Sequence, residues 1–195
     1  MKIAVIKYNA GNIQSVLFAL KRLDVTPTWT DDPDVIQSAD KVIFPGQGEA
    51  SNAMKYLRER ELDKLIKGLK QPVLGICIGL QLMCKYSAEG DTECLGIFDE
   101  EVVRFNEGLK VPHVGWNTIK NKKGPLMEHL TTPAYLYYVH SYYAKVGPQT
   151  VATTDYGVPF SAVMQQDNFY AVQGHPEKSG KDGEQILRNF LQIKS

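Results

Sequence analysis

The chain has 195 residues, and its 22 lysines and arginines are balanced by 22 aspartates and glutamates. This length predicts a single domain over residues 1–195, and the balanced charge argues against nucleic acid or an anionic membrane as a partner. No apolar run approaches the roughly 20 residues of a membrane span, so we expect a cytoplasmic protein. The three cysteines, Cys77, Cys84 and Cys94, include no Cys-x-x-Cys pair, which argues against a disulfide framework or a structural metal site.

Strands and helices alternate through the first half of the chain. Short apolar runs predict strands, and apolar side chains spaced by three and four residues predict helices. The expected strands are residues 2–8, 26–30, 41–44 and 73–76, and the expected helices are 13–23 and 49–69, with a short helix or turn near Val35 and Ile36. Such alternation predicts an α/β fold with an open, mostly parallel central sheet and helices on both faces.

The second half of the chain has a different pattern. From residue 101 to residue 173 short strands and turn signals predominate, and no convincing helix is predicted. The expected strands are residues 101–105, 116–120, 135–139, 150–154, 162–165 and 169–173. We therefore expect this half to be largely antiparallel, followed by a final helix near residues 182–193.

Cys77 stands at a junction between the strand at residues 73–76 and a helix that continues through Cys84. Glycines lie two residues before and two after it, at Gly75 and Gly79. This spacing is that of a nucleophile elbow, with sulfur in place of the serine oxygen, because side chains at the glycine positions would collide in so sharp a turn. The following helix would favour the thiolate. The spacing alone leaves open the alternative of an unreactive core cysteine.

The second chemical motif is His175-Pro176-Glu177. In an extended backbone, residues i and i+2 face the same way, and Pro176 biases His175 towards that conformation. A histidine oriented by a carboxylate is the base that a cysteine nucleophile needs. The alternative is a turn with a solvated ion pair. The remaining histidines (His113, His129 and His140) have no carboxylate at this spacing.

Together these motifs resemble the class I glutamine amidotransferases, whose catalytic triad is Cys, His and Glu in this order. Residues 8–16, 112–117 and 139–142 further resemble the glutaminase subunits of imidazole glycerol phosphate synthase, so the resemblance spans residues 8–178. It implies that Cys77 attacks the amide of L-glutamine, that His175 transfers protons and that Glu177 orients the histidine. The resemblance also implies a heterodimer with a (βα)₈-barrel cyclase, which uses the ammonia in histidine biosynthesis to make imidazole glycerol phosphate and aminoimidazole carboxamide ribotide. No cofactor is implied.

The same resemblance assigns further positions. The oxyanion of the reaction would be bound at Gly46, Gln47 and Ile78; the substrate would contact Gln81, Glu89, Ser141 and Tyr142; and the partner would contact Asn12, Trp116 and Lys178. Plain core packing is the alternative for Trp116. The sequence departs from the family at Gln47, where an aliphatic residue is usual, and at Lys7, where an acidic one is usual.

Three other functions compete with this interpretation. The first is another class I glutaminase, such as the one that feeds pyridoxal phosphate synthase, which the segments around Asn12 and Trp116 fit poorly. The second is a cysteine hydrolase with histidine directly after the nucleophile, which Ile78 argues against. The third is a non-catalytic binding or redox-sensing α/β domain with a reactive Cys77.

Overall fold

The structure is a computed structural model, and it describes residues 1–8, 13–46 and 48–194. Asn12 and Gln47, two of the predicted site positions, lie outside the described residues. The helices are α1 (Gln14–Arg22), α2 (Pro33–Gln37), α3 (Ala50–Glu59), α4 (Leu62–Gly68), α5 (Ile78–Met83) and α6 (Gly180–Gln192), with short 3₁₀ turns η1 (Pro125–Met127) and η2 (Pro176–Lys178). The strands are β1 (Ile3–Ile6), β2 (Thr28–Thr30), β3 (Lys41–Phe44), β4 (Val73–Ile76), β5 (Cys84–Ser87), β6 (Thr92–Glu93), β7 (Phe98–Arg104), β8 (His113–Ile119), β9 (Ala134–His140), β10 (Tyr142–Ala144), β11 (Thr150–Asp155), β12 (Pro159–Gln166) and β13 (Phe169–Val172).

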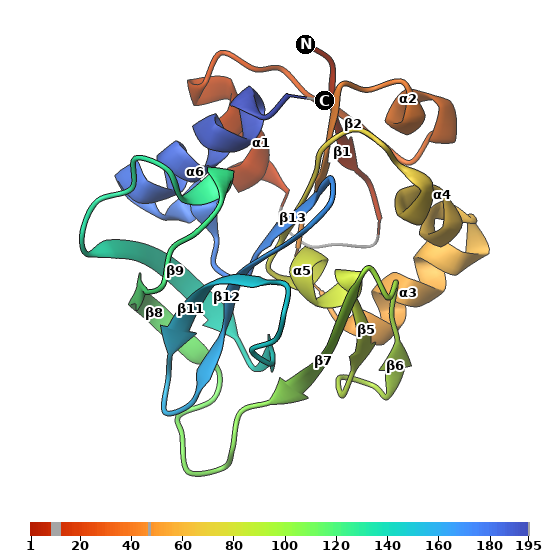
Figure 1. The fold of residues 1–195 in the computed structure, drawn as a ribbon. Coiled ribbons are helices and arrows are strands. Elements are labelled where there is room, and N and C mark those ends of the chain that lie inside the picture. The colour runs from red at the N-terminus through yellow and green to blue at the C-terminus, as the bar shows by residue number, and fades with distance from the viewer. Residues whose placement is uncertain (9–12, 47, 195) are drawn as a thin grey trace.

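The central sheet has the strand order β11-β12-β13-β4-β3-β1-β2 (Figure 1). Strands β2, β1, β3, β4 and β13 are parallel to one another, whereas β12 and β11 continue the sheet in antiparallel fashion beyond β13. β4 therefore lies in the middle of the sheet, with β3 on one side and β13 on the other. The predicted mostly parallel central sheet is confirmed.

Helices cover both faces of this sheet because the side chains of its buried strands alternate between two cores. On one face, Ala4 and Ile6 of β1 pack with residues of α2, α3, α4 and α5. On the other face, Ile3 and Val5 pack with residues of α1 and α6. Figure 1 shows these two helical layers on opposite sides of the sheet, with the two chain ends close together at the top of the view.

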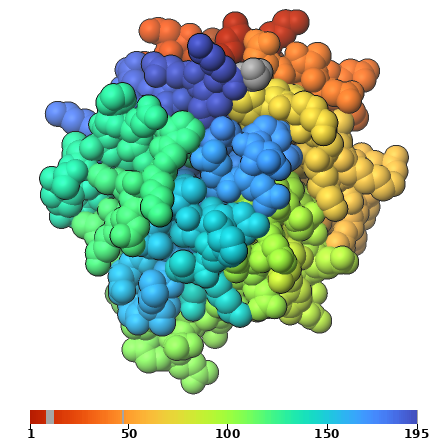
Figure 2. Space-filling model, viewed as in Figure 1, coloured from red at the N-terminus to blue at the C-terminus, as the bar shows by residue number. Residues whose placement is uncertain are grey.

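The second half of the chain adds two smaller sheets. β8 and β9 form an antiparallel pair, and a further sheet has the order β10-β7-β5-β6. Most of these pairings are antiparallel as expected, although β5 runs parallel to β7. In the space-filling view the β11–β13 segment, coloured cyan to blue, covers the middle of the visible face (Figure 2).

Two predicted elements were wrong in detail. The single helix expected at residues 49–69 is two helices, with Glu61 between them in the left-handed conformation at φ 56°. An unbroken helix would point Leu57 and Leu62, five residues apart, in different directions, whereas the break brings both into the same core, fully buried. Cys84 is not on a helix face: it is the first residue of β5 and is buried there.

Among the described residues, no helix has the length and apolar character needed to cross a membrane.

Candidate active site

Cys77 occupies the turn between the end of β4 and the start of α5. Its backbone has φ 52° and ψ −107°, an unfavourable conformation for a residue with a side chain. The turn is held in place because the Cys77 backbone N–H donates a 2.8 Å hydrogen bond to the carbonyl of Val172 at the end of β13. The buried apolar run of β4 leads directly into this turn, as the sequence pattern predicted.

The flanking glycines are required by close backbone contacts. A Cβ atom on Gly75 would lie 2.9 Å from the carbonyl carbon of Gly79, and one on Gly79 would lie 2.2 Å from the carbonyl oxygen of Phe44. These separations are shorter than real Cβ atoms tolerate, so side chains there would force the elbow apart. The structure thus agrees with the reason that the sequence analysis gave for this spacing.

His175 and Glu177 form a buried pair. The Nδ1 atom of His175 lies 2.8 Å from Oε1 of Glu177, and the two side chains are only 1% and 3% exposed. His175 is extended, with φ −104° and ψ 90°, and Glu177 follows it in the 3₁₀ turn η2. Proline at position 176 both starts this turn and favours the extended conformation of His175, so a short local motif builds the pair.

The charge state of His175 is set by its two neighbours. Burial by itself would lower its pKa, but the Cys77 sulfur and the Glu177 carboxylate outweigh this effect and raise the pKa to about 10. The imidazole is therefore charged at neutral pH, next to Cys77. Its Nε2 atom is buried and, apart from Cys77, has no hydrogen-bond partner among the described residues, which leaves a proton there available to a bound molecule.

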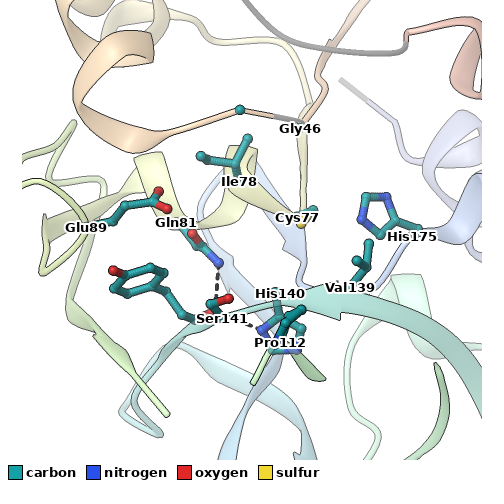
Figure 3. A pocket seen from close by; sticks show the side chains of 12 residues that line it. Gly46, Cys77, Ile78, Gln81, Glu89, Pro112, Val139, His140, Ser141 and His175 are labelled. Atoms are coloured by element: carbon teal, nitrogen blue, oxygen red, sulfur yellow. Dashed lines mark hydrogen bonds between the residues drawn. The ribbon is translucent and has the colours of Figure 1, made fainter. Parts of the chain in front are cut away.

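A pocket of about 380 Å³ opens beside Cys77 and His175 (Figure 3). Eight of the predicted site residues line it: Gly46, Cys77, Ile78, Gln81, Glu89, Ser141, Tyr142 and His175. In Figure 3, His175 and Val139 lie on one side of Cys77, and Gln81 and Glu89 lie on the other. Residues that were far apart in the sequence are thus brought to one cavity of a size typical of small-molecule sites.

Gly46, just beyond the end of β3, packs against the elbow itself. A Cβ atom on Gly46 would lie 2.0 Å from the Ile76 carbonyl oxygen and 2.5 Å from the Ile78 backbone nitrogen. The Ile78 amide stands at the first position of α5, where a helix provides no internal partner for an N–H group. The backbone around residue 46 therefore faces the first amide of α5 across the nucleophile turn.

The wall of the pocket opposite His175 is polar. Nε2 of Gln81 donates a 2.8 Å hydrogen bond to the carbonyl of Tyr142, and Oε2 of Glu89 accepts one of 2.9 Å from the backbone N–H of Ala50, the first residue of α3. Burial raises the pKa of the Glu89 carboxyl above its usual range. The resemblance had assigned Gln81 and Glu89 to the substrate without indicating these internal contacts.

A buried histidine pair, to which the sequence motifs assigned no role, stands at the pocket, with His140 in its lining. His113 of β8 and His140 of β9 are opposite each other in the strand register, with His113 Nδ1 3.1 Å from His140 Nε2. Burial lowers the pKa of His113 to about 4 and that of His140 to about 3, so both rings are neutral at neutral pH. The only sequence signal was that both lie in motifs of the resemblance, since their pairing depends on the register of two separate strands.

Two of the three predicted partner residues, Trp116 and Lys178, lie among the described residues. Trp116 of β8 is 56% exposed, which excludes the core-packing alternative, and Lys178, half-buried, directly follows Glu177. Lys7 is exposed, with its Nζ atom 5.5 Å from the ring centre of Trp29. Within the described part of the chain, no group of three or more His, Cys, Asp or Glu side chains is arranged to hold a metal ion.

Comparison with known proteins agrees with this geometry. The family model for glutamine amidotransferase class-I matches residues 5–193. A crystal structure of a glutamine amidotransferase is similar with a TM-score of 0.76 and 19% identity, covering 97% of both chains. Another glutamine amidotransferase, from Thermotoga maritima, is similar with a TM-score of 0.65 and 14% identity, covering 98% of this chain and 82% of that one. The fold is that of this class of enzyme.

Full-length relatives with high sequence identity show which family of class I glutamine amidotransferases this chain resembles. The chain is 57% identical to imidazole glycerol phosphate synthase subunit HisH of Bacteroides fragilis and 45% identical to that of Escherichia coli, in each case over 99% of this chain and 100% of the relative. The HisH subunit of Vibrio parahaemolyticus is 45% identical, with 98% of both chains covered. This chain therefore belongs to the HisH family of class I glutamine amidotransferases.

Proposed function

We propose that this chain, acting as a single amidotransferase domain, hydrolyses L-glutamine to glutamate and ammonia and passes the ammonia to a cyclase subunit. In histidine biosynthesis, that subunit would make imidazole glycerol phosphate and aminoimidazole carboxamide ribotide. The observation that carries this proposal is the strained Cys77, which opens on the same pocket as a charged His175 paired with Glu177. Membership of the HisH family supports the choice of pathway.

In the proposed mechanism, the reaction begins from a thiolate–imidazolium pair. The Cys77 sulfur attacks the side-chain amide carbon of glutamine, and as the C–N bond breaks the imidazolium transfers its Nε2 proton to the departing nitrogen, releasing ammonia. A water molecule, deprotonated by the now neutral His175, attacks the thioester. Cleavage of the C–S bond releases glutamate and restores the pair. Glu177 holds the Nδ1–H side of the ring, so that Nε2 faces the reacting atoms.

The tetrahedral intermediate carries an oxyanion, and backbone N–H groups would stabilise it. The Ile78 amide is one proposed donor, because it begins α5 directly after the nucleophile. The segment that starts at Gly46 is the proposed source of the second donor, because its backbone packs against the Ile78 nitrogen. Gln47, which also belongs to this proposed turn, lies outside the described residues.

The polar wall of the pocket suits the amino-acid end of glutamine. We assign the Glu89 carboxylate to the substrate ammonium group, and Gln81 to its polar atoms. Ser141 and Tyr142, at the β9–β10 junction, line the same end of the pocket and would contact the substrate largely through their backbone. With this assignment, the side-chain amide of glutamine would lie at Cys77.

The β8–β9 pair offers a surface for the cyclase partner. Its outward face carries the exposed side chains of Val114, Trp116, Tyr135 and Val139, whereas the alternate residues of β9 are buried. Val139 also lines the pocket, so the surface is continuous with the active site. An exposed apolar face of this kind is typical of a protein interface. We propose that it contacts a (βα)₈-barrel cyclase in a cytoplasmic heterodimer; three free cysteines suit such a reducing compartment.

Replacement of the nucleophile tests the proposed reaction. Cys77→Ser is nearly isosteric, so the variant should fold, lose glutamine hydrolysis and still support cyclase activity when ammonia is supplied. Glutamate release and cyclase product are measured separately. Glutamine hydrolysis by Cys77→Ser at the wild-type rate would contradict the proposal.

The partner is tested with surface variants. Trp116→Ala and Lys178→Ala should weaken binding to the cyclase, and with it the stimulation of glutamine hydrolysis, as measured by titration and glutamate release. Trp29→Ala is the matched control, because this second tryptophan is 46% exposed on β2, the edge strand beyond β1. Unchanged binding and stimulation in both test variants would exclude this surface as the docking site.

A further inference from the structure

Gln173 directly follows β13, two residues before His175, and its side chain is completely buried. Its backbone N–H donates a 2.8 Å hydrogen bond to the carbonyl of Ala162, which joins it to β12. Its carboxamide Nε2 lies 3.7 Å from the sulfur of Cys77. The mechanism described above does not use this residue.

The direction of the Gln173 carboxamide is determined by Gln81. The Tyr142 carbonyl can only accept hydrogen bonds, so Gln81 presents its NH₂ group to it, at 2.8 Å. The same NH₂ group lies 3.1 Å from Gln173 Oε1, which must therefore be the carbonyl oxygen. This leaves the NH₂ group of Gln173 as the part that faces the Cys77 sulfur, and it can only donate.

The neutral histidine pair holds the other end of this network. His140 Nδ1 lies 2.8 Å from the Tyr142 carbonyl, so Nδ1 carries the proton and Nε2 accepts a hydrogen bond from Nδ1–H of His113. Nε2 of His113 then faces the side-chain NH₂ group of Asn117 at 3.4 Å. The Tyr142 carbonyl thus accepts from both His140 and Gln81, which restricts the position of the Gln81 amide.

We propose that Gln173 is a positioning residue: its carboxamide, oriented by Gln81, donates a hydrogen bond to the Cys77 sulfur and holds it as a thiolate directed at the substrate pocket. An N–H donor stabilises a thiolate more than a thiol, because the charged sulfur is the stronger acceptor. The proposal rests on the assignment of Cys77 as the nucleophile. In this proposal, the hydrogen bonds among Gln81, the Tyr142 carbonyl and His140 all help to fix the direction of the Gln173 carboxamide.

The test is the pH dependence of Cys77 alkylation by iodoacetamide in the full chain, followed by mass spectrometry with the buried Cys84 and Cys94 as internal references. Gln173→Met has a similar length and no donor; Gln173→Glu keeps the acceptor for Gln81 but replaces the donor with a negative charge. Among the described residues, the titratable side chains that interact with Cys77 are His175 and Tyr8, and both variants leave them unchanged.

We expect Gln173→Met to shift half-maximal alkylation to higher pH and to reduce the rate at pH 7 about tenfold, with a larger shift for Gln173→Glu. In the complex, kcat for glutamine should fall more than KM rises. The matched control is Asn189→Leu, which removes a buried amide that donates 3.0 and 2.7 Å hydrogen bonds to the carbonyls of Leu126 and Glu128. It should lower the midpoint of thermal unfolding without moving the alkylation profile.

The outcomes separate this inference from the proposed function. If wild-type Cys77 is alkylated selectively and Cys77→Ser is inactive, but both Gln173 variants keep the wild-type pH profile, the positioning role is wrong and the glutaminase proposal stands. If wild-type Cys77 is alkylated no faster than Cys84, or if Cys77→Ser still hydrolyses glutamine, the proposed function itself is wrong. If the pH profile of Cys77 alkylation shifts in Gln173→Glu but not in Gln173→Met, the inference is also overturned. The added negative charge, and not the lost hydrogen-bond donor, would then explain the shift.

Discussion

Replacement of Glu177 by glutamine removes one charge from the buried pair and leaves its size almost unchanged. The Glu177 Oε1 and His175 Nδ1 atoms are 2.8 Å apart, where opposite charges attract by about 6 kcal/mol at an effective dielectric constant of about 20. Loss of one partner from such a buried pair usually costs about 3–5 kcal/mol. If this loss falls on the transition state, kcat for glutamine decreases about 10²- to 10⁴-fold.

The assay measures glutamate release from glutamine and, separately, cyclase turnover with added ammonia, which should be unaffected in Glu177→Gln. Because the carboxylate is one of the groups that raise the pKa of His175, its removal should move the alkaline limb of the pH–rate profile to lower pH. Glu184→Gln is the control: Glu184 lies 2.7 Å from Arg188 at the surface of α6, where the pair contributes less than about 1 kcal/mol. Glutaminase activity of Glu177→Gln within threefold of wild type would refute the role assigned to Glu177.

Three further results are expected. Tyr8→Phe removes the buried donor to the Pro45 carbonyl, next to the proposed oxyanion turn, so it should destabilise the fold by about 1–3 kcal/mol in urea unfolding and lower kcat; unchanged stability and kcat would exclude this role. The pKa values of His113 and His140 in the folded state are lowered to about 4 and about 3, so below about pH 6.5 the unfolded chain binds protons that the folded chain does not. The free energy of unfolding should therefore be highest above about pH 6.5 and should decrease by a few kcal/mol between pH 7 and pH 4. A free energy of unfolding that does not change over this range would contradict this. Asp182→Ala removes the acceptor of three backbone and hydroxyl donors between residues 131 and 135, so we expect a loss of about 2–4 kcal/mol; a change below about 0.5 kcal/mol would show that these bonds contribute little.

Several parts of this molecule follow from local sequence. The strands β3 and β4 were predicted with the bounds that the structure has, because a short apolar run needs no information about distant residues to be buried on both faces. The approach of His175 to Glu177 was also predictable, since both residues lie in one three-residue motif with a proline between them. The spacing of Gly75, Cys77 and Gly79 likewise predicts the sharp turn at Cys77. The catalytic roles of these residues remain predictions that the variants above test.

Other features depended on which segments the fold brings together. The break at Glu61 could not be predicted from periodicity. It is decided by the packing of Leu57 and Leu62 in the same core, and no local sequence preference indicates it. β5 follows α5 without a turn signal, and its pairing with β7 decides that it is a strand. Exposure of Trp116 also required the structure, since an aromatic residue in a strand suits a core equally well.

The amide and histidine network at the pocket is the clearest case of a feature that only the tertiary structure decides. The Gln81 side chain meets a carbonyl 61 residues away, and Gln173 meets a sulfur 96 residues away. His113 meets His140 only because β8 and β9 pair in one particular register. Local patterns record which face of an element is apolar, and that information is enough to place buried strands such as β3 and β4, the elbow and the final helix. The partner of a buried polar group is chosen by packing between elements, because any donor and acceptor of suitable shape could satisfy it, so the sequence alone does not specify it.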